Sequence, residues 1–266
     1  MMQKRWLMAL PAVFILGLTG CAENAQQRLN DQTVAAINWT QQSGEYQALT
    51  WQAFNVATQA FDNAVSESGK PGAVIVDLDE TMLDNSAYQA WQAKNDQPFT
   101  DASWSAWTRA RQARAVPGAV EFARYVDSHG GTVFYVSNRD QKDYQATVDN
   151  LTALGFPGVS NNTLRLSTTT SNKQARFDEI RQSGANVVLY IGDNLNDFGG
   201  ASWHKDNAQR REFVSNNHAL FGTKFIILPN PQYGDWESGL ADGYNQLSAQ
   251  QKIQVREQNL RAWNGQ

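Results

Sequence analysis

The sequence predicts an α/β fold: a Rossmann-like core with a mostly parallel central sheet, helices on both faces and a small helical cap. Short apolar segments such as AVIVD (73–77) and NVVLYIGD (186–193) have the length and composition of buried strands. Helical patterns separate these segments, and glycine and proline mark most of the boundaries. Alternating strands and helices imply right-handed crossovers, which place helices on both faces of a parallel sheet.

The first twenty residues are predicted to be a signal peptide. Lys4 and Arg5 precede an apolar stretch, residues 6–20, that is too short to be a membrane-spanning helix. The ending Leu-Thr-Gly-Cys21 resembles the bacterial lipobox, and Cys21 is the only cysteine of the chain. Lipidation there would hold the protein at a bilayer through Cys21. With Ala22 after the cysteine, we expect an exported lipoprotein of the outer membrane, on its periplasmic or surface side.

The mature chain is expected to consist of a lipidated tether, residues 21–45, and one domain, residues 46–266. The tether is rich in Gln, Asn and Ala. The domain begins with a helix that ends before Gly69, Pro71 and Gly72, and its apolar residues have helical spacing: Leu49, Phe54, Val56, Phe61 and Val65.

The segment around 85–115 differs from its surroundings because aromatic residues stand among polar ones, and it is predicted to be a helical cap insertion. The remaining predicted elements alternate. Helices are expected over 117–128, 141–154, 172–184, 207–217 and 245–263, and strands over 132–140, 163–167, 186–193 and 223–230.

Charge limits the class of partner. Without Lys4 and Arg5, 20 Lys and Arg residues remain against 26 Asp and Glu residues. A net acidic surface argues against binding of nucleic acid polymers. A single cysteine cannot form an intramolecular disulfide. The sequence leaves the oligomeric state undecided, with a homodimer among the alternatives.

Acidic residues gather where predicted strands end. Asp77, Asp79, Glu80 and Asp84 directly follow the 73–77 segment, and DNLND (193–197) follows another. In open α/β sheets, ligands bind at the carboxyl ends of the strands. Several carboxylates in one cleft need countercharge, and Mg2+ is a hard cation that takes carboxylate, water and phosphate oxygens. A carboxylate can also attack phosphorus, with a second one acting as general acid.

These residues resemble a known family. D-x-D-x-T at 77–81, Ser137, Lys173 and G-D-N-x-x-D at 192–197 match the four signatures of the haloacid-dehalogenase-like (DDDD) phosphohydrolases. More narrowly, VDLDETMLDNS, VPGAVEF, VFYVSNR, SNKQARF and YIGDNLNDFG look like the class C acid phosphatases. That family comprises bacterial lipoproteins and includes the outer-membrane lipoprotein e type 5'-nucleotidases.

The resemblance implies a role for each matching residue. Asp77 would be the nucleophile and a Mg2+ ligand, and Asp79 the general acid/base with its backbone carbonyl on the metal. Ser137 and Lys173 would hold the phosphoryl oxygens, with Lys173 also offsetting charge beside Asp77. Asp193 would be a direct metal ligand.

Asp197 would support the metal site from behind Asp193. Asn138 and Arg139 are predicted to contact substrate, although a structural ion pair is an equally open interpretation for Arg139.

Aromatic residues are expected to sandwich the ring of the substrate. In the family, the cap and a late loop supply these side chains, and Phe99, Trp104 and Tyr233 fall at the corresponding places. The implied substrates are small phosphomonoesters: nucleoside 5'-monophosphates and other aromatic monoesters.

Other interpretations remain open at this point. The acidic cluster could be a solvated turn, Ser137 a helix cap, Lys173 a surface residue and Asp197 an N-cap. The three histidines share no ligand spacing, which leaves zinc without support. A non-catalytic binding or adhesion lipoprotein on the same fold is the main alternative function, and a dehalogenase or a mutase is a further one.

Overall fold

The computed structural model describes residues 19–266, with side chains from residue 25 onward. Nearly all of the predicted signal peptide, and the side chain of Cys21, therefore lie outside the described part. Among the described residues, no helix combines the length and the apolar character needed to cross a membrane.

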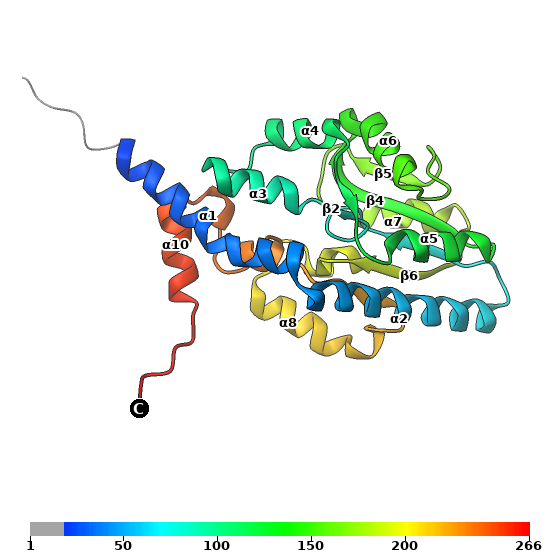
Figure 1. Cartoon of the computed structure of the whole chain (residues 1–266). Helices are drawn as coiled ribbons and strands as arrows, with labels where there is room; N and C mark the ends of the chain where they lie inside the picture. The colour runs from blue at the N-terminus through cyan, green and yellow to red at the C-terminus, as the bar shows by residue number, and fades with distance from the viewer. Residues whose placement is uncertain (1–18) are drawn as a thin grey trace, which may run out of the picture.

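The core is a parallel sheet of five strands in the order β5-β4-β1-β6-β7 (Figure 1). The strands are β1 (Ala73–Val76), β4 (Thr132–Asp140), β5 (Leu164–Ser167), β6 (Val187–Gly192) and β7 (Phe225–Ile227). β1 lies in the centre, and Val76 at its end pairs with Tyr135 of β4 and Ile191 of β6. This confirms the predicted fold class and brings the ends of β1, β4 and β6 together.

Side chains of β1 alternate between two cores, one on each face of the sheet. Val74 and Val76 pack with α2 (Gly44–Ser68) and α5 (Ala119–Ser128), and Ala73 and Ile75 pack with α7 (Gln174–Gln182). Burial on both faces explains why β1 is continuously apolar.

Three further helices and five 3-10 turns complete the layers and the connections of the core. They are α6 (Tyr144–Leu154), α8 (Asn207–Asn216), α9 (Asp235–Ser238) and the 3-10 turns η1 (Gln141–Asp143), η2 (Leu195–Phe198), η3 (Gly200–Ser202), η4 (His218–Leu220) and η5 (Tyr244–Gln246).

The insertion after β1 contains α3 (Ser86–Asn95) and α4 (Asp101–Ala110). A short antiparallel pair, β2 (Leu83–Asp84) with β3 (Arg114–Ala115), closes its base. Asp143, which is 3% exposed, ties α4 to the core by accepting hydrogen bonds from Ser105 Oγ at 2.6 Å and Arg109 Nε at 2.7 Å. The cap is therefore fastened to the domain on the side of α6.

Two terminal segments differ from the sequence prediction. Residues 19–42 form a helix, α1 (Thr19–Gln42), that packs against α3 and α10 (Ala249–Gln258), where a tether was expected (Figure 1). Polar side chains that suggested a tether instead make contacts: Asn30 Nδ2 donates to the Gln92 carbonyl at 3.2 Å. α10 is shorter than the predicted 245–263 helix: it ends at Gln258, and it starts at Ala249 because Ser248 and Gln251 form a capping box there.

Candidate active site

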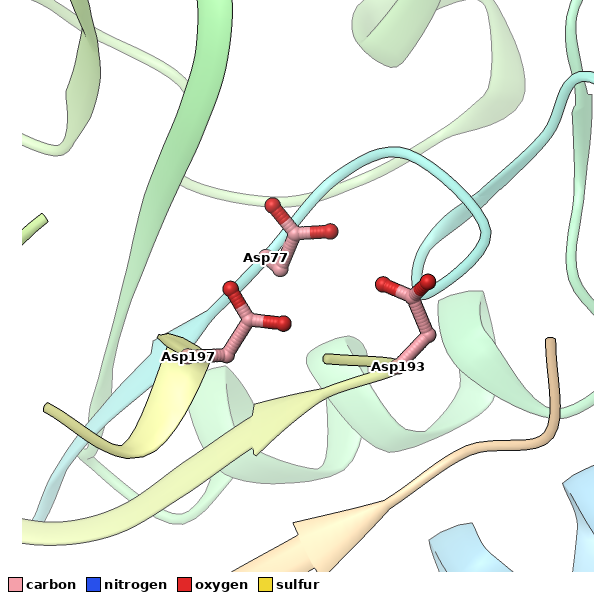
Figure 2. Close-up of side chains that lie close together, drawn as sticks. All are labelled: Asp77, Asp193 and Asp197. Carbon is pink, nitrogen blue, oxygen red and sulfur yellow. The ribbon is translucent and has the colours of Figure 1, made fainter. Parts of the chain in front are cut away.

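Three aspartates from two strand ends lie around one point. Asp77 follows β1, whereas Asp193 follows β6 and Asp197 lies in η2 just beyond it. One carboxylate oxygen from each lies within 4.8 Å of the others, and Figure 2 shows the three groups around a common space. Two adjacent parallel strands thus bring together residues separated by more than a hundred positions.

Lys173 joins two of these aspartates. It is 4% exposed, stands directly before α7, and its Nζ donates to Asp77 Oδ1 and, at 2.7 Å, to Asp197 Oδ1. Burial would lower the pKa of Lys173, but Asp197 and Asp77 outweigh it and raise that pKa to about 12. The lysine is therefore held as a cation against the carboxylates.

One lysine is too little charge for this cluster. Asp77, Asp193 and Asp197 against Lys173 leave two negative charges when all four groups are ionised. Burial, reinforced by Asp77 and Asp197, raises the pKa of Asp193 well above its ordinary value. A hard divalent cation with oxygen ligands fits both the donor set and the missing charge.

Asp197 is held by one charged partner and one backbone partner. Asp197 Oδ1 is bonded to Lys173, and Asp197 Oδ2 accepts from the Asn194 backbone N–H at 3.0 Å, so both of its oxygens are engaged. Both oxygens of Asp77 and of Asp193 are hydrogen-bonded as well, so these contacts do not separate direct ligands from a supporting residue, and that division stays a prediction.

Two neutral residues orient Asp77 and Asp193. Thr81 Oγ1 lies 3.2 Å from Asp77 Oδ2 and 3.3 Å from Asp193 Oδ1, and Asn230 Nδ2 donates to Asp193 Oδ2 at 2.8 Å. Asn230 had no assigned role in the sequence analysis. A signal was present, since Asn230 is the polar residue that ends the apolar segment predicted as the strand 223–230.

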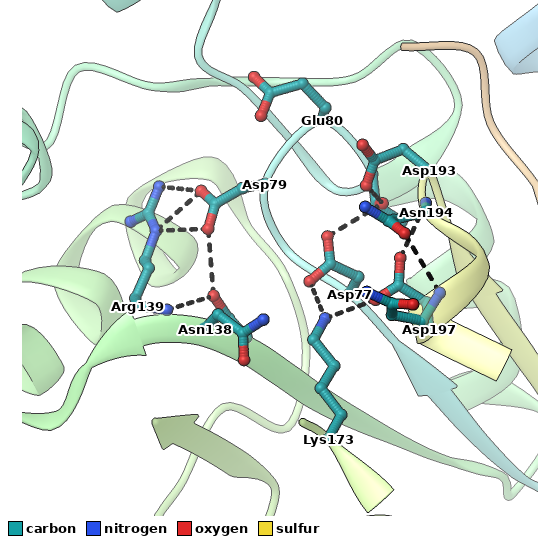
Figure 3. A network of polar contacts seen from close by, with 12 residues as sticks. Asp77, Asp79, Glu80, Asn138, Arg139, Lys173, Asp193, Asn194 and Asp197 are labelled. Atoms are coloured by element: carbon teal, nitrogen blue, oxygen red, sulfur yellow. Dashed lines mark hydrogen bonds and ion pairs between the residues drawn. The ribbon is translucent and has the colours of Figure 1, made fainter. Parts of the chain in front are cut away.

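Asp79 belongs to a second polar group (Figure 3). Arg139, which is 1% exposed, contacts both oxygens of Asp79, with Nη2 at 2.7 Å from Oδ1 and Nε at 3.2 Å from Oδ2. Asn85 Nδ2 donates to Asp79 Oδ1 at 2.9 Å, and Ser137 Oγ donates to Oδ2 at 3.1 Å. Arg139 therefore forms the structural ion pair that the sequence analysis left open, and Ser137 is fully buried beside it.

Arg176 fixes the end of β4. Its Nη1 donates to the Ser137 carbonyl and its Nη2 to Asn138 Oδ1, both at 2.6 Å. The sequence analysis missed this residue. A signal was present, since Arg176 stands three positions after Lys173 and so lies on the same side of the first turn of α7.

Glu80 connects the β1 end to a late loop. It is 2% exposed, has a left-handed backbone with φ of 61°, and accepts hydrogen bonds from the Tyr233 hydroxyl and, at 2.9 Å, from the Asn85 backbone N–H. Burial, with Asp79 and Asp193 nearby, raises the pKa of Glu80 well above its usual range. A non-glycine residue in this conformation is held there by its surroundings, and the bond to Tyr233 is one such restraint.

One cavity of about 600 Å3 contains the polar groups and the predicted aromatic residues. Asp77, Asp79 and Lys173 line one part of it, and Phe99, Trp104 and Tyr233 also contribute to its wall, together with Asn138 and Arg139. Trp104 packs edge-to-face on Tyr88 at 5.1 Å between ring centroids, whereas Phe99 is 59% exposed. The structure thus brings the predicted site residues together, while their individual roles stay predictions.

Comparison with known proteins gives consistent matches. Residues 19–236 match the family model described as HAD superfamily, subfamily IIIB (Acid phosphatase). Acid phosphatase 1 of Solanum lycopersicum is 29% identical over 133 residues, which are 48% of this chain and 52% of that protein, so the alignment spans about half of the curated relative.

Solved structures extend the likeness to most of the chain. The class C acid phosphatase from Bacillus anthracis superposes with a TM-score of 0.84 at 36% identity, covering 89% of this chain and all of that one. A structure of the Bacillus anthracis class C acid phosphatase with tungstate bound gives the same TM-score at 35% identity.

Proposed function

The chain belongs to the acid phosphatases of HAD superfamily subfamily IIIB, a family of phosphomonoesterases, and from this we propose a Mg2+-dependent 5'-nucleotidase that forms an aspartyl-phosphate. The observation that carries the proposal is the shared cavity. Its lining combines a carboxylate–lysine cluster suited to phosphoryl transfer with aromatic rings suited to a nucleobase.

At the polar end, Asp77 acts as the nucleophile. One carboxylate oxygen of Asp77 attacks phosphorus while the bond to the ester oxygen breaks, and the departing oxygen takes a proton from Asp79. Asp79 then accepts a proton from the water that attacks the aspartyl-phosphate, which releases phosphate and restores Asp77. Lys173 offsets charge beside Asp77 throughout.

Mg2+ would be held by Asp77, Asp193 and the backbone carbonyl of Asp79, with Asp197 in support, and would supply positive charge to the phosphoryl oxygens. Tungstate is a tetrahedral oxyanion like phosphate, and its presence in the Bacillus anthracis enzyme supports an oxyanion site in this family. Lys173 and the Ser137–Asn138 segment, which Arg176 holds in place, would bind the phosphoryl oxygens.

The proton donor is restrained in the present arrangement. Asp79 is paired with Arg139 and bonded to Asn85 and Ser137, so proton transfer requires that it exchange a partner for the leaving oxygen. Arg139 thus fixes the orientation of the Asp79 carboxylate. Arg139 also lines the cavity, where it would contact the substrate.

At the aromatic end, Tyr233 and Trp104 supply faces for a substrate ring, with Phe99 at the more exposed edge. We expect Tyr233→Ala to lower kcat/KM for a nucleoside 5'-monophosphate by about ten- to a hundred-fold, because base stacking on one aromatic side chain is worth roughly 1–3 kcal/mol. For ribose 5-phosphate, which has no aromatic ring to stack, the change should be slight. Steady-state phosphate release from both substrates measures the effect.

Tyr233→Phe is the matched control, because it keeps the ring and removes only the hydroxyl that donates to Glu80. If stacking is the role of Tyr233, the Phe variant keeps most of the nucleotide preference. Equal losses on both substrates for the Ala variant would show that Tyr233 is structural, and the assignment would return to a general acid phosphatase.

We also propose that the protein is anchored to the outer membrane by lipid at Cys21. The support is the sequence alone: a basic start, an apolar stretch and one cysteine at the lipobox position. α1 includes this position and packs against α3 and α10, so the domain would lie close to the lipid-bearing residue and hence to the membrane surface.

Cys21→Ser is expected to abolish lipidation, since the hydroxyl does not replace the thiol in thioether formation. Metabolic labelling with a radioactive fatty acid should mark the wild-type protein and not the variant. Phosphatase activity of the solubilised variant should match that of the wild type, because Cys21 precedes Asp77 by more than fifty positions. Label in the Ser variant would contradict the proposal.

A further inference from the structure

We propose that Gln92, with Gln89 beside it, forms a polar subsite that binds the hydrogen-bonding edge of a nucleobase. The inference rests on the nucleotidase function proposed above, and it names residues that would distinguish a base from a plain aromatic ring. Both glutamines belong to the cap helix α3 and stand three positions apart, hence on one side of that helix.

Gln92 is a mostly buried residue whose side-chain amide has no hydrogen-bond partner in the described part of the chain. The residue is 8% exposed, and its side-chain amide makes no hydrogen bond to any residue in the described part of the chain. The amide atoms of Gln92 are not among the buried atoms that lack a partner, and the residue lines a cavity, so water can reach the amide there. Because no other side chain occupies its donors and acceptor, the amide is available to a ligand in the cavity.

The backbone of Gln92 is fixed in place. Its carbonyl oxygen accepts hydrogen bonds from Asn30 Nδ2 of α1 at 3.2 Å and from the Gln97 backbone N–H at 3.0 Å. Since α1 and α3 pack together, the amide is presented from a braced helix. Such bracing lowers the ordering cost of binding.

The amides lie at the junction of two cavities. A smaller cavity of about 170 Å3 lies next to the main one of about 600 Å3. The residues that line both are Gln89, Gln92, Phe99, Tyr233 and Glu237. Two rings and two amides thus share the same part of the wall.

This combination matches the chemistry of a heterocycle. Aromatic side chains contact the faces of a ring, whereas a glutamine amide offers donors and an acceptor to its edge. Glutamine pairs in this way with adenine edges in nucleic acid recognition. Phenyl esters have no polar edge, so they would gain from the rings and gain nothing from Gln92.

The test compares purine substrates that differ only at the edge. Adenosine and inosine 5'-monophosphates carry an exocyclic amino or oxo group, which purine riboside 5'-monophosphate lacks, while all three present a purine face for stacking. For wild-type enzyme, kcat/KM for either the adenosine or the inosine nucleotide, whichever is higher, should exceed that for purine riboside 5'-monophosphate by about three- to ten-fold. This ratio corresponds to the free energy of one hydrogen bond.

Gln92→Leu should remove this preference, and the exposed Gln47→Leu on α2 should keep it. Equal rates for the three purine nucleotides on wild-type enzyme would overturn the subsite, as would a Gln92→Leu variant with unchanged preference. If that variant does not fold, as judged by thermal unfolding, the wild-type comparison still decides.

Failure of the nucleotidase proposal has a different signature. In that case ribose 5-phosphate would be hydrolysed as well as the purine nucleotides. A strong preference for purines over ribose 5-phosphate without any preference among the purines would overturn only the subsite.

Discussion

Asp77→Asn should reduce turnover by about a thousand-fold or more, equivalent to about 4 kcal/mol of barrier. The amide keeps the shape of the side chain but is a far poorer nucleophile than a carboxylate, and no aspartyl-phosphate can form. Retention of more than about a tenth of the wild-type rate would contradict the covalent role. Quenching the wild-type reaction with labelled substrate in acid should trap label on the protein, and the variant should trap none.

The same substitution should leave the fold intact. Burial, reinforced by Asp197 and Asp79 and opposed by Lys173, raises the pKa of Asp77 from 3.8 to about 7 in the metal-free protein. The folded state therefore binds more protons than the unfolded state between these values, and Asp77 makes stability fall as pH rises from about 4 to about 7. Asparagine lacks this titration.

With chelator at neutral pH, the Asp77→Asn variant should melt at or above the temperature of wild type. Thermal unfolding followed by circular dichroism measures this. A matched control is Asp127→Asn on the exposed side of α5, which should change neither turnover nor melting temperature appreciably. A large drop in the melting temperature of the Asp77 variant would instead indicate that its activity loss follows from unfolding.

Asp193→Asn should weaken the affinity for Mg2+ by at least about ten-fold, because one charged ligand becomes neutral. In the structure Asp193 has Thr81 and Asn230 as its hydrogen-bond partners, so the side chain is already oriented and the substitution changes chiefly its charge. Activity measured against Mg2+ concentration, after removal of metal by EDTA, should shift to higher concentration and recover in part.

Asp127→Asn serves again as the control, with an unshifted Mg2+ titration. If Mg2+ restores the activity of wild type but does not change the activity of the Asp193 variant at any concentration, Asp193 is not a ligand. If wild type keeps full activity after exhaustive chelation, the metal requirement itself is wrong.

The sequence was most informative about the sheet and its edge. β1 and β6 are apolar runs that end in acids, and the rule that ligands bind at the carboxyl ends of parallel strands was enough to place Asp77, Asp79 and Asp193 together. The match to family signatures then supplied roles that strand order alone does not, such as the position of Lys173 before α7.

Long-range side-chain pairing was not predictable. The Tyr233 hydroxyl donates a hydrogen bond to Glu80, 153 positions away in the sequence, and the local sequence around neither residue predicts this bond. Asn85 likewise connects Asp79, Glu80 and Trp107, although its neighbourhood looks like an ordinary helix start. Such contacts depend on how the cap and the late loop approach β1.

The N-terminal segment was misjudged for a different reason. Composition rich in Gln and Asn is typical of a tether, but α1 is held by a few specific contacts that composition does not reveal. Ile37 is 4% exposed, and Arg256 of α10 donates to Gln32 Oε1 at 2.9 Å. Few apolar residues at the right positions, with hydrogen bonds around them, are sufficient for docking.

The packing of α1 against α10 also limits when folding of the domain can be completed. α1 precedes the strands of the sheet in the sequence and α10 follows them, so the whole sheet is synthesised before one of the two helices that α1 contacts. Arg256, which reaches both Gln32 of α1 and Glu237 beside the cavity, arrives with that final helix. A chain that stops before α10 therefore lacks both this helix and the contact of Arg256 with Glu237 at the wall of the substrate pocket.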